Sequence, residues 1–123
     1  MIPPMIAPEI AQHLPGIRAI CKRQGVERMS FFGSAAREDF SPETSDVDCL
    51  IKFLKINKPG IADRYFNLIE GLEKTCHRPV DIVFEGTMKN YIFQKIVEKS
   101  KVLIYDATNE KVRLLHERLA KLL

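Results

Sequence analysis

The sequence predicts an α/β (α+β) fold in which a small mixed β-sheet is flanked by helices. Segments with strand periodicity alternate with segments of helical periodicity along the 123 residues, and no repeat or long linker divides them. Hydrophobic residues make up 46% of the chain and charged residues 28%, which is a globular composition and excludes a disordered or fibrous protein. We therefore expect one domain over residues 1–123.

The first half of the chain contains one predicted helix and two predicted strands. Residues 15–24 show helical spacing of apolar side chains, with Pro15 in the first turn and Gly25 as the stop signal. Residues 26–32 read as a strand that ends at a Gly-Ser pair. Residues 47–54 have one wholly apolar face, which predicts the second strand.

The second half continues the alternation. Residues 61–72 have helical spacing, residues 80–84 alternate like a strand, residues 90–99 read as a helix, and residues 102–105 as a short strand. We expect the apolar side chains of the two helices to lie in the core, namely Tyr65, Phe66, Tyr91, Ile92, Phe93, Ile96 and Val97.

A last helix is predicted from Thr108, which can cap it, to the C-terminus. It has a leucine-rich stripe made of Val112, Leu115, Leu119 and Leu122. Basic residues border the stripe, namely Lys111, Arg113, Arg118 and Lys121. Two interpretations remain open, because such a stripe packs either on the core of its own domain or on a partner.

Cysteine usage and charge indicate the setting of the protein. Cys21, Cys49 and Cys76 are odd in number and far apart, so we expect buried free thiols rather than disulfides or a zinc site. No segment resembles a signal peptide or approaches the ~20 apolar residues of a membrane span, so we expect a cytoplasmic protein with no membrane contact. A formal net charge of +3 is too small to indicate a nucleic acid partner.

Three aspartates form a candidate metal site. Asp46 and Asp48 stand at positions i and i+2 at the start of the second strand, and Asp81 lies on the polar face of the third. Three carboxylates on neighbouring strands repel one another unless a cation neutralises them, and hard oxygen ligands suit Mg²⁺ or Mn²⁺. Lys52 lies on the same strand face, where it would counter these charges or reach a phosphate.

A candidate anion site precedes these acids in the chain. Gly33 lets the backbone approach a ligand, Ser34 can cap the turn that follows, and Arg37 adds a planar cationic donor. A Gly-Ser turn or a D-x-D pair by itself is more often ordinary surface, so the prediction depends on their combination. An anion cradle followed by metal-binding acids is what phosphoryl or nucleotidyl transfer requires.

Residues 32–37 (FGSAAR), 45–48 (SDVD) and 80–83 (VDIV) resemble the signature of the polymerase-beta-type nucleotidyltransferases. The closest resemblance is to their minimal (MNT) branch of stand-alone catalytic domains, and it covers residues 20–105. It implies that the three aspartates are catalytic and hold two Mg²⁺ ions with the nucleoside triphosphate. It also implies that the third acid activates the acceptor hydroxyl and that the Gly-Ser turn contacts the triphosphate.

The resemblance further implies a function. Members of the minimal branch commonly occur as antitoxins paired with HEPN-domain RNase toxins, whose tyrosine they adenylylate. We therefore expect a nucleotidyltransferase that moves AMP from ATP to a HEPN partner within a hetero-oligomer, since so short a chain has little room for an acceptor-binding domain. Two alternatives remain open: transfer to a small molecule or RNA, and an antitoxin that acts by complex formation alone.

Overall fold

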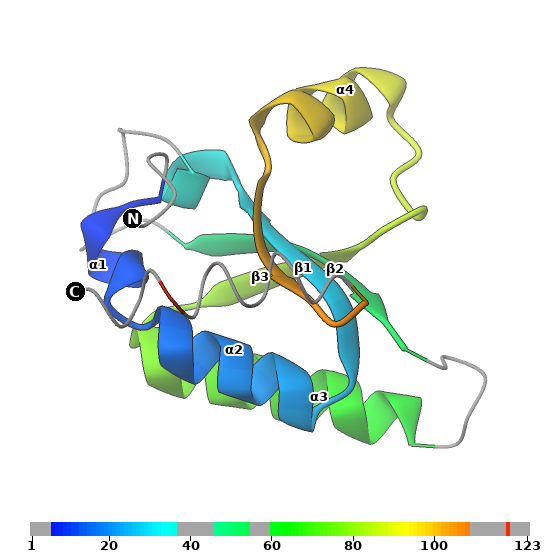
Figure 1. Ribbon diagram of the computed structural model, residues 1–123. Coiled ribbons are helices and arrows are strands. Elements are labelled where there is room, and N and C mark those ends of the chain that lie inside the picture. The colour runs from blue at the N-terminus through cyan, green and yellow to red at the C-terminus, as the bar shows by residue number, and fades with distance from the viewer. Residues whose placement is uncertain (1–5, 37–45, 55–59, 109–117, 119–123) are drawn as a thin grey trace.

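Four strands form one mixed sheet in the computed structural model, which describes residues 6–36, 46–54, 60–108 and 118. The elements, in chain order, are α1 (Pro8–Ala11), α2 (Leu14–Arg23), β1 (Val26–Phe32), the 3-10 turn η1 (Gly33–Ala36), β2 (Val47–Phe53), α3 (Ile61–Cys76), β3 (Val80–Phe84), α4 (Tyr91–Ser100) and β4 (Val102–Asp106) (Figure 1). The predicted fold class is confirmed, and the predicted strands agree with the observed ones to within one residue.

The strand order in the sheet is β3-β2-β1-β4. β1 runs antiparallel to both β2 and β4, whereas β2 and β3 are parallel and are connected through α3. Figure 1 shows α2 and α3 side by side on one face of the sheet and α4 on the other. We call the face that carries α4 the open face.

The main core fills the space between the sheet and the α2–α3 layer. Alternate residues of β2 point into it, and Val47, Cys49 and Ile51 are almost fully buried. α2 contributes the helical stripe that its sequence predicts, with Ile17 and Cys21 fully buried. The short helix α1, whose Ile10 is also fully buried, was not predicted, because four residues are too few to display a helical repeat.

On the open face, a smaller apolar cluster holds α4 against the sheet. Phe32, Leu50 and Val97 are buried there, and Val83 and Met88 pack against them. The prediction that the apolar residues of α4 all face inward was wrong: only Val97 is buried, while Tyr91, Ile92, Phe93 and Ile96 are exposed, as is Phe66 on α3. The physical reason is that most of the open face is polar, so it offers α4 only a narrow apolar strip.

The predicted last helix lies outside the described residues, except for Arg118, which is helical. Its expected cap, Thr108, is described, and both its backbone N–H and its hydroxyl donate to Asp106 Oδ1, at 2.9 and 2.7 Å. Among the helices of the described residues, none has the length and apolarity needed to cross a bilayer.

Arg64 on α3 joins three loop ends with one guanidinium group. Its Nε donates to the carbonyl of Gln24 at 3.0 Å, and its Nη2 donates to the carbonyls of Gly25 and Leu54 at 2.8 and 2.6 Å. The guanidinium also lies 4.8 Å from the centroid of the Phe53 ring. The planar fork therefore holds the start of β1 and the end of β2 against α3.

We predict that Arg64→Ala lowers the free energy of unfolding by about 2 kcal/mol, because part-buried carbonyls lose charge-assisted hydrogen bonds. Arg64→Lys should recover less than half of the loss, since a single ammonium cannot reach three carbonyls in the geometry of the fork. Urea unfolding measures both, with Arg23→Ala on the exposed side of α2 as the control. Equal stability of Arg64→Lys and wild type would contradict the role of the fork.

The three cysteines are free and buried, as predicted. Burial raises the pKa of Cys21 from 9.0 to about 12 and that of Cys76 to about 11. The pKa of Cys49 lies well above its usual value, chiefly because of burial and in addition because Cys21, Cys76, Asp48 and Asp81 lie near.

These raised pKa values predict that stability falls in alkali. The thiols ionise near pH 9 in the unfolded chain but stay protonated in the folded one. Their contribution is therefore complete below about pH 9 and declines as pH rises toward the folded-state pKa values of about 11 and about 12. Urea unfolding across this range should show a smaller decline for Cys21→Ala/Cys76→Ala than for wild type. The double variant retains every other group that titrates in alkali, so the difference between its pH dependence of stability and that of wild type isolates these two thiols. An identical pH dependence in the two proteins would refute their role.

Candidate functional site

The pairing of β2 with β3 brings two of the predicted acids together. In the parallel register Asp48 lies opposite Asp81, and on the other side of β2 the register places Asp48 opposite Phe32, the last residue of β1. Adjacent strands are about 4.8 Å apart, so the two carboxylates are direct neighbours on the open face. Asp46 immediately precedes β2 and is exposed.

Successive rows of residues across the strands organise the open face. The row at the end of β1 is Phe32, Asp48 and Asp81, and the next row is Ser30, Leu50 and Val83. The third row contains Arg28 and Lys52, with Glu85 following the end of β3. Thus the candidate acids lie at one end of the face, the apolar strip that holds α4 lies in the middle, and a charged cluster lies at the far end.

Gly33 is in direct proximity to the candidate acids. Its φ is +65°, which L side chains rarely adopt, and a Cβ built on it would overlap Asp48 Oδ2. The sequence predicted that glycine here would allow a ligand to approach the backbone. The structure shows in addition that glycine makes room for the carboxylate of Asp48 beside the turn η1.

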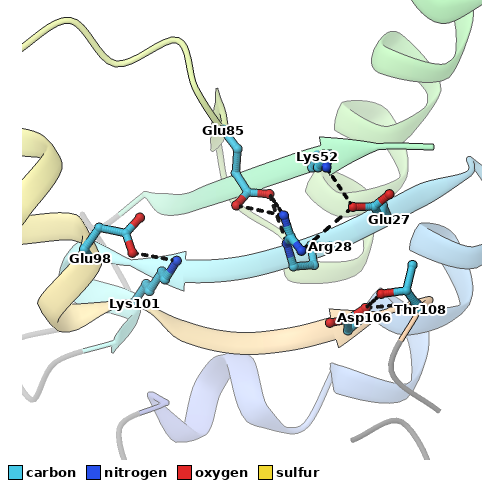
Figure 2. A network of polar contacts seen from close by, with 8 residues as sticks. All are labelled: Glu27, Arg28, Lys52, Glu85, Glu98, Lys101, Asp106 and Thr108. Carbon is cyan, nitrogen blue, oxygen red and sulfur yellow. Dashed lines mark hydrogen bonds and ion pairs between the residues drawn. The ribbon is translucent and has the colours of Figure 1, made fainter. Parts of the chain in front are cut away.

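Lys52 belongs to the charged cluster at the far end of the open face. Lys52 Nζ lies 3.1 Å from Glu27 Oε2, and Arg28 Nη2 lies 3.1 Å from Glu85 Oε2, as Figure 2 shows. Of the interpretations of Lys52 that the sequence left open, this ion pair favours an ordinary surface lysine over a countercharge of the aspartates. Register determines this outcome, because Lys52 lies two rows away from Asp48 and beside β1.

A hollow of about 210 Å³ on the open face was not predicted from the sequence. It is lined by Arg28, Ser30, Leu50, Glu85, Lys101 and Leu103. Ser30 is buried although it is polar, and the polar residues Arg28 and Ser30 on one face of β1 were the local signal that something other than core packing occurs there. Lys101 pairs with Glu98 at 2.9 Å, so each charged side chain that lines the hollow has an ion-pair partner.

The remaining predicted site residues are described only in part. Ser34 lies in η1, but its side chain falls outside the described residues, as does all of Arg37. Within the described ranges, no three His, Cys, Asp or Glu side chains are arranged to hold a metal ion. The three-aspartate metal site therefore stays a prediction, of which the structure brings together Asp48 and Asp81.

The adjacent carboxylates nevertheless have the chemistry that Mg²⁺ requires. Two like charges on neighbouring strands repel each other, and a divalent cation relieves that repulsion. Mg²⁺ is usually bound by one or two carboxylates together with substrate phosphates rather than by an all-protein cage. The Asp48–Asp81 pair fits this mode, in which the phosphates complete the ligand set.

The contact between Gly33 and Asp48 leads to a prediction with a matched control. Gly33→Ala should lower the free energy of unfolding by about 1–2 kcal/mol because of the left-handed backbone. The overlap of the new Cβ with Asp48 should add a further loss. Gly86→Ala carries only the first cost, because φ is +82° and nothing lies within 4 Å of the added Cβ. In a chain that also carries Asp48→Ala, Gly33→Ala and Gly86→Ala should lower the free energy of unfolding by the same amount. A cost of Gly33→Ala that is unchanged by Asp48→Ala in urea unfolding would show that the carboxylate plays no part.

Comparison with known proteins identifies a family for this chain. A family model described as "Nucleotidyltransferase domain" matches residues 14–113. A Methanocaldococcus jannaschii protein named "Putative protein adenylyltransferase MJ1379" is 32% identical over 79 residues, which are 64% of this chain and 77% of that protein.

Solved structures show the same fold. One described as "Structure of putative minimal nucleotidyltransferase" is 26% identical, with a TM-score of 0.62, over 76% of this chain and 90% of that one. Another, "Crystal structure of the toxin-antitoxin with AMP-PNP", is 13% identical, with a TM-score of 0.57, over 86% of this chain and 88% of that one. The family match spans most of the chain, and the resemblance of the three motifs is thereby confirmed: this chain belongs to the nucleotidyltransferase domain family and has the fold of a minimal nucleotidyltransferase.

Proposed function

We propose that this protein transfers AMP from ATP to a tyrosine hydroxyl of a HEPN-domain RNase toxin and thereby acts as its antitoxin. The observation that carries the proposal is the juxtaposition of Asp48 and Asp81 in the β2–β3 register, beside the turn that begins at Gly33. The M. jannaschii relative, whose name is that of a protein adenylyltransferase, supports a protein acceptor. The structure described as a toxin–antitoxin with AMP-PNP supports a toxin as the partner and an adenine nucleotide as the substrate.

In this proposal the triphosphate lies along the end of β1. Gly33 and Ser34 contact its phosphates, since a turn without a Cβ at its first residue lets backbone N–H groups approach an anion. Arg37 provides a cationic donor from the chain that follows. The carboxylate of Asp48, next to Gly33, lies where a phosphate-bound cation would be held.

Asp46, Asp48 and Asp81 would hold two Mg²⁺ ions together with the phosphate oxygens. The ions supply charge that stabilises the pyrophosphate leaving group. Asp48 is half-buried, and the carboxylates of Asp46 and Asp81 are exposed. Exposed carboxylates remain free to turn toward an arriving ligand, which suits a site that is completed by its substrate.

Asp81 is the residue proposed to accept the proton of the acceptor. The tyrosine oxygen attacks the α-phosphorus, a new O–P bond forms, and the bond to the bridging oxygen breaks, so that pyrophosphate leaves with its electron pair. The hydroxyl proton passes to the Asp81 carboxylate and from there to water. Because Asp81 is exposed at the start of β3, a hydroxyl on a folded partner can reach it.

The test is transfer of label from α-³²P-ATP to a HEPN-domain protein encoded beside this one. Wild type with Mg²⁺ should label a tyrosine of that partner, and EDTA should abolish labelling until Mg²⁺ is restored. Asp48→Asn and Asp81→Asn keep the side-chain shape but lose the charge, so each should lower the labelling rate by at least about 100-fold. The matched control is Asp63→Asn, an exposed carboxylate on the far helix α3, which should label at the wild-type rate.

Other outcomes would replace the proposal. Label on an RNA end or on an aminoglycoside, with none on the partner, would identify a nucleotidyltransferase with a different acceptor. Full inhibition of the partner RNase by Asp46→Asn/Asp48→Asn, in the absence of any label, would identify an antitoxin that works by complex formation alone.

A further inference from the structure

The outer surface of α4 exposes an unusual amount of apolar side chain for so small a protein. Tyr91 is 65% exposed, Ile92 71%, Phe93 41% and Ile96 54%, and we call these four residues the α4 patch. They lie within two turns of one helix, of which Val97 alone is buried. A contiguous apolar patch that the described residues leave uncovered marks an interaction surface.

The α4 patch adjoins the candidate site. The ring of Phe93 meets the ring of Phe32 edge to face, with centroids 6.0 Å apart. Phe32 is the register partner of Asp48 and immediately precedes Gly33. A macromolecule that covers the patch is thus one side chain away from the end of the sheet at which the candidate acids lie. Figure 1 shows α4 on the face of the sheet opposite α2 and α3.

The border of the α4 patch is basic. Lys89 precedes the helix, and Lys95 and Lys99 are exposed along it. Lys95 Nζ lies 4.8 Å from the centroid of the Tyr91 ring, so the positive charge is held against the patch itself. The acid of this helix, Glu98, pairs with Lys101 at 2.9 Å. The surface therefore presents apolar side chains bordered by positive charge.

Charge disfavours two of the occupants that this chain itself could provide. A second copy docked through the same patch would bring the lysines of both copies together, because a two-fold interface pairs like with like. The C-terminal residues 109–123 contain Lys111, Arg113, Arg118 and Lys121 against Glu110 and Glu117, so they are also net basic.

We propose that the α4 patch is the docking surface for a partner protein whose contacting surface is apolar and bordered by Asp and Glu. Docking here places that partner beside Asp48 and Asp81, so it is the acceptor of the nucleotidyl group. The identity of the partner as acceptor rests on the proposed function; the docking surface and its charge preference do not. The apolar residues provide the affinity, and the lysines select the partner by charge.

The test uses two synthetic amphipathic helical peptides of about 20 residues, each with a leucine face. One peptide has glutamates along the border of this face, and the other has lysines at the same positions. Fluorescence anisotropy with the full chain should show that the glutamate peptide binds at least about tenfold more tightly than the lysine peptide. Amide chemical shifts should change mainly along α4.

Charge reversal makes the test specific. Lys95→Glu/Lys99→Glu should invert the preference, so that the lysine peptide binds more tightly. Ile92→Glu and Ile96→Glu should each weaken binding of the glutamate peptide by at least about tenfold, since each places a charge in the apolar contact. Phe66→Glu on α3 is the matched control, because Phe66 is 66% exposed and lies on another helix. This variant should bind the glutamate peptide with the affinity of wild type. All the substituted side chains are exposed, and circular dichroism checks that each variant folds.

Equal binding of the two peptides would overturn the inference. So would amide chemical-shift changes located away from α4, or an unchanged affinity of Ile96→Glu for the glutamate peptide. The inference would also be overturned if wild type bound neither peptide but formed dimers lost in Ile96→Glu, or bound phosphatidylserine vesicles instead. Failure of the proposed function gives a different result: peptide binding then persists, in wild type and in Asp48→Asn, while no partner is labelled. Labelling of a partner with unchanged KM in Lys95→Glu/Lys99→Glu would refute the docking surface and leave the proposed function standing.

Discussion

The parallel register between β2 and β3 is the constraint on which the rest of the structure depends. It sets Val47 against Val80 in the core and, one residue later, Asp48 against Asp81 on the open face. The backbone N–H of Val47 donates to the carbonyl of Pro79 at 3.0 Å, which holds the start of the ladder. A shift of β3 by one residue would move Asp81 to the core side and Val80 into solvent, so burial of Val80 also determines where its neighbouring acid lies.

The two faces of the sheet have different roles because they are covered differently. α2 and α3 seal one face with a continuous apolar core, which provides most of the hydrophobic burial. On the other face α4 is held by a small cluster around Leu50 and Val97, and the remaining surface consists of acids, an ion-paired cluster and a hollow. The candidate acids are thus confined to one face, and α4 packs beside them with most of its apolar side chains outward.

Membership in the nucleotidyltransferase family and the geometry of the open face support the same type of reaction. The carboxylates of Asp48 and Asp81 are neighbours beside a glycine turn, and the described residues hold no complete protein-only metal cluster. Mg²⁺ in proteins is usually bound by one or two carboxylates together with substrate phosphates. The exposed patch on α4 then adds a place for an acceptor that arrives on another molecule.

The amino-acid sequence by itself determined the strands, the mixed α/β class, the buried cysteines and the three motifs of the family, because alternation and turn residues are local properties. Only the tertiary structure decided that Asp48 faces Asp81, that Gly33 accommodates a carboxylate, and that Lys52 pairs with Glu27, since these depend on which strands are neighbours. It also decided that α4 turns Ile92 and Ile96 outward. Helical periodicity shows that a face is apolar, but the surface available beneath the helix decides how much of that face is buried.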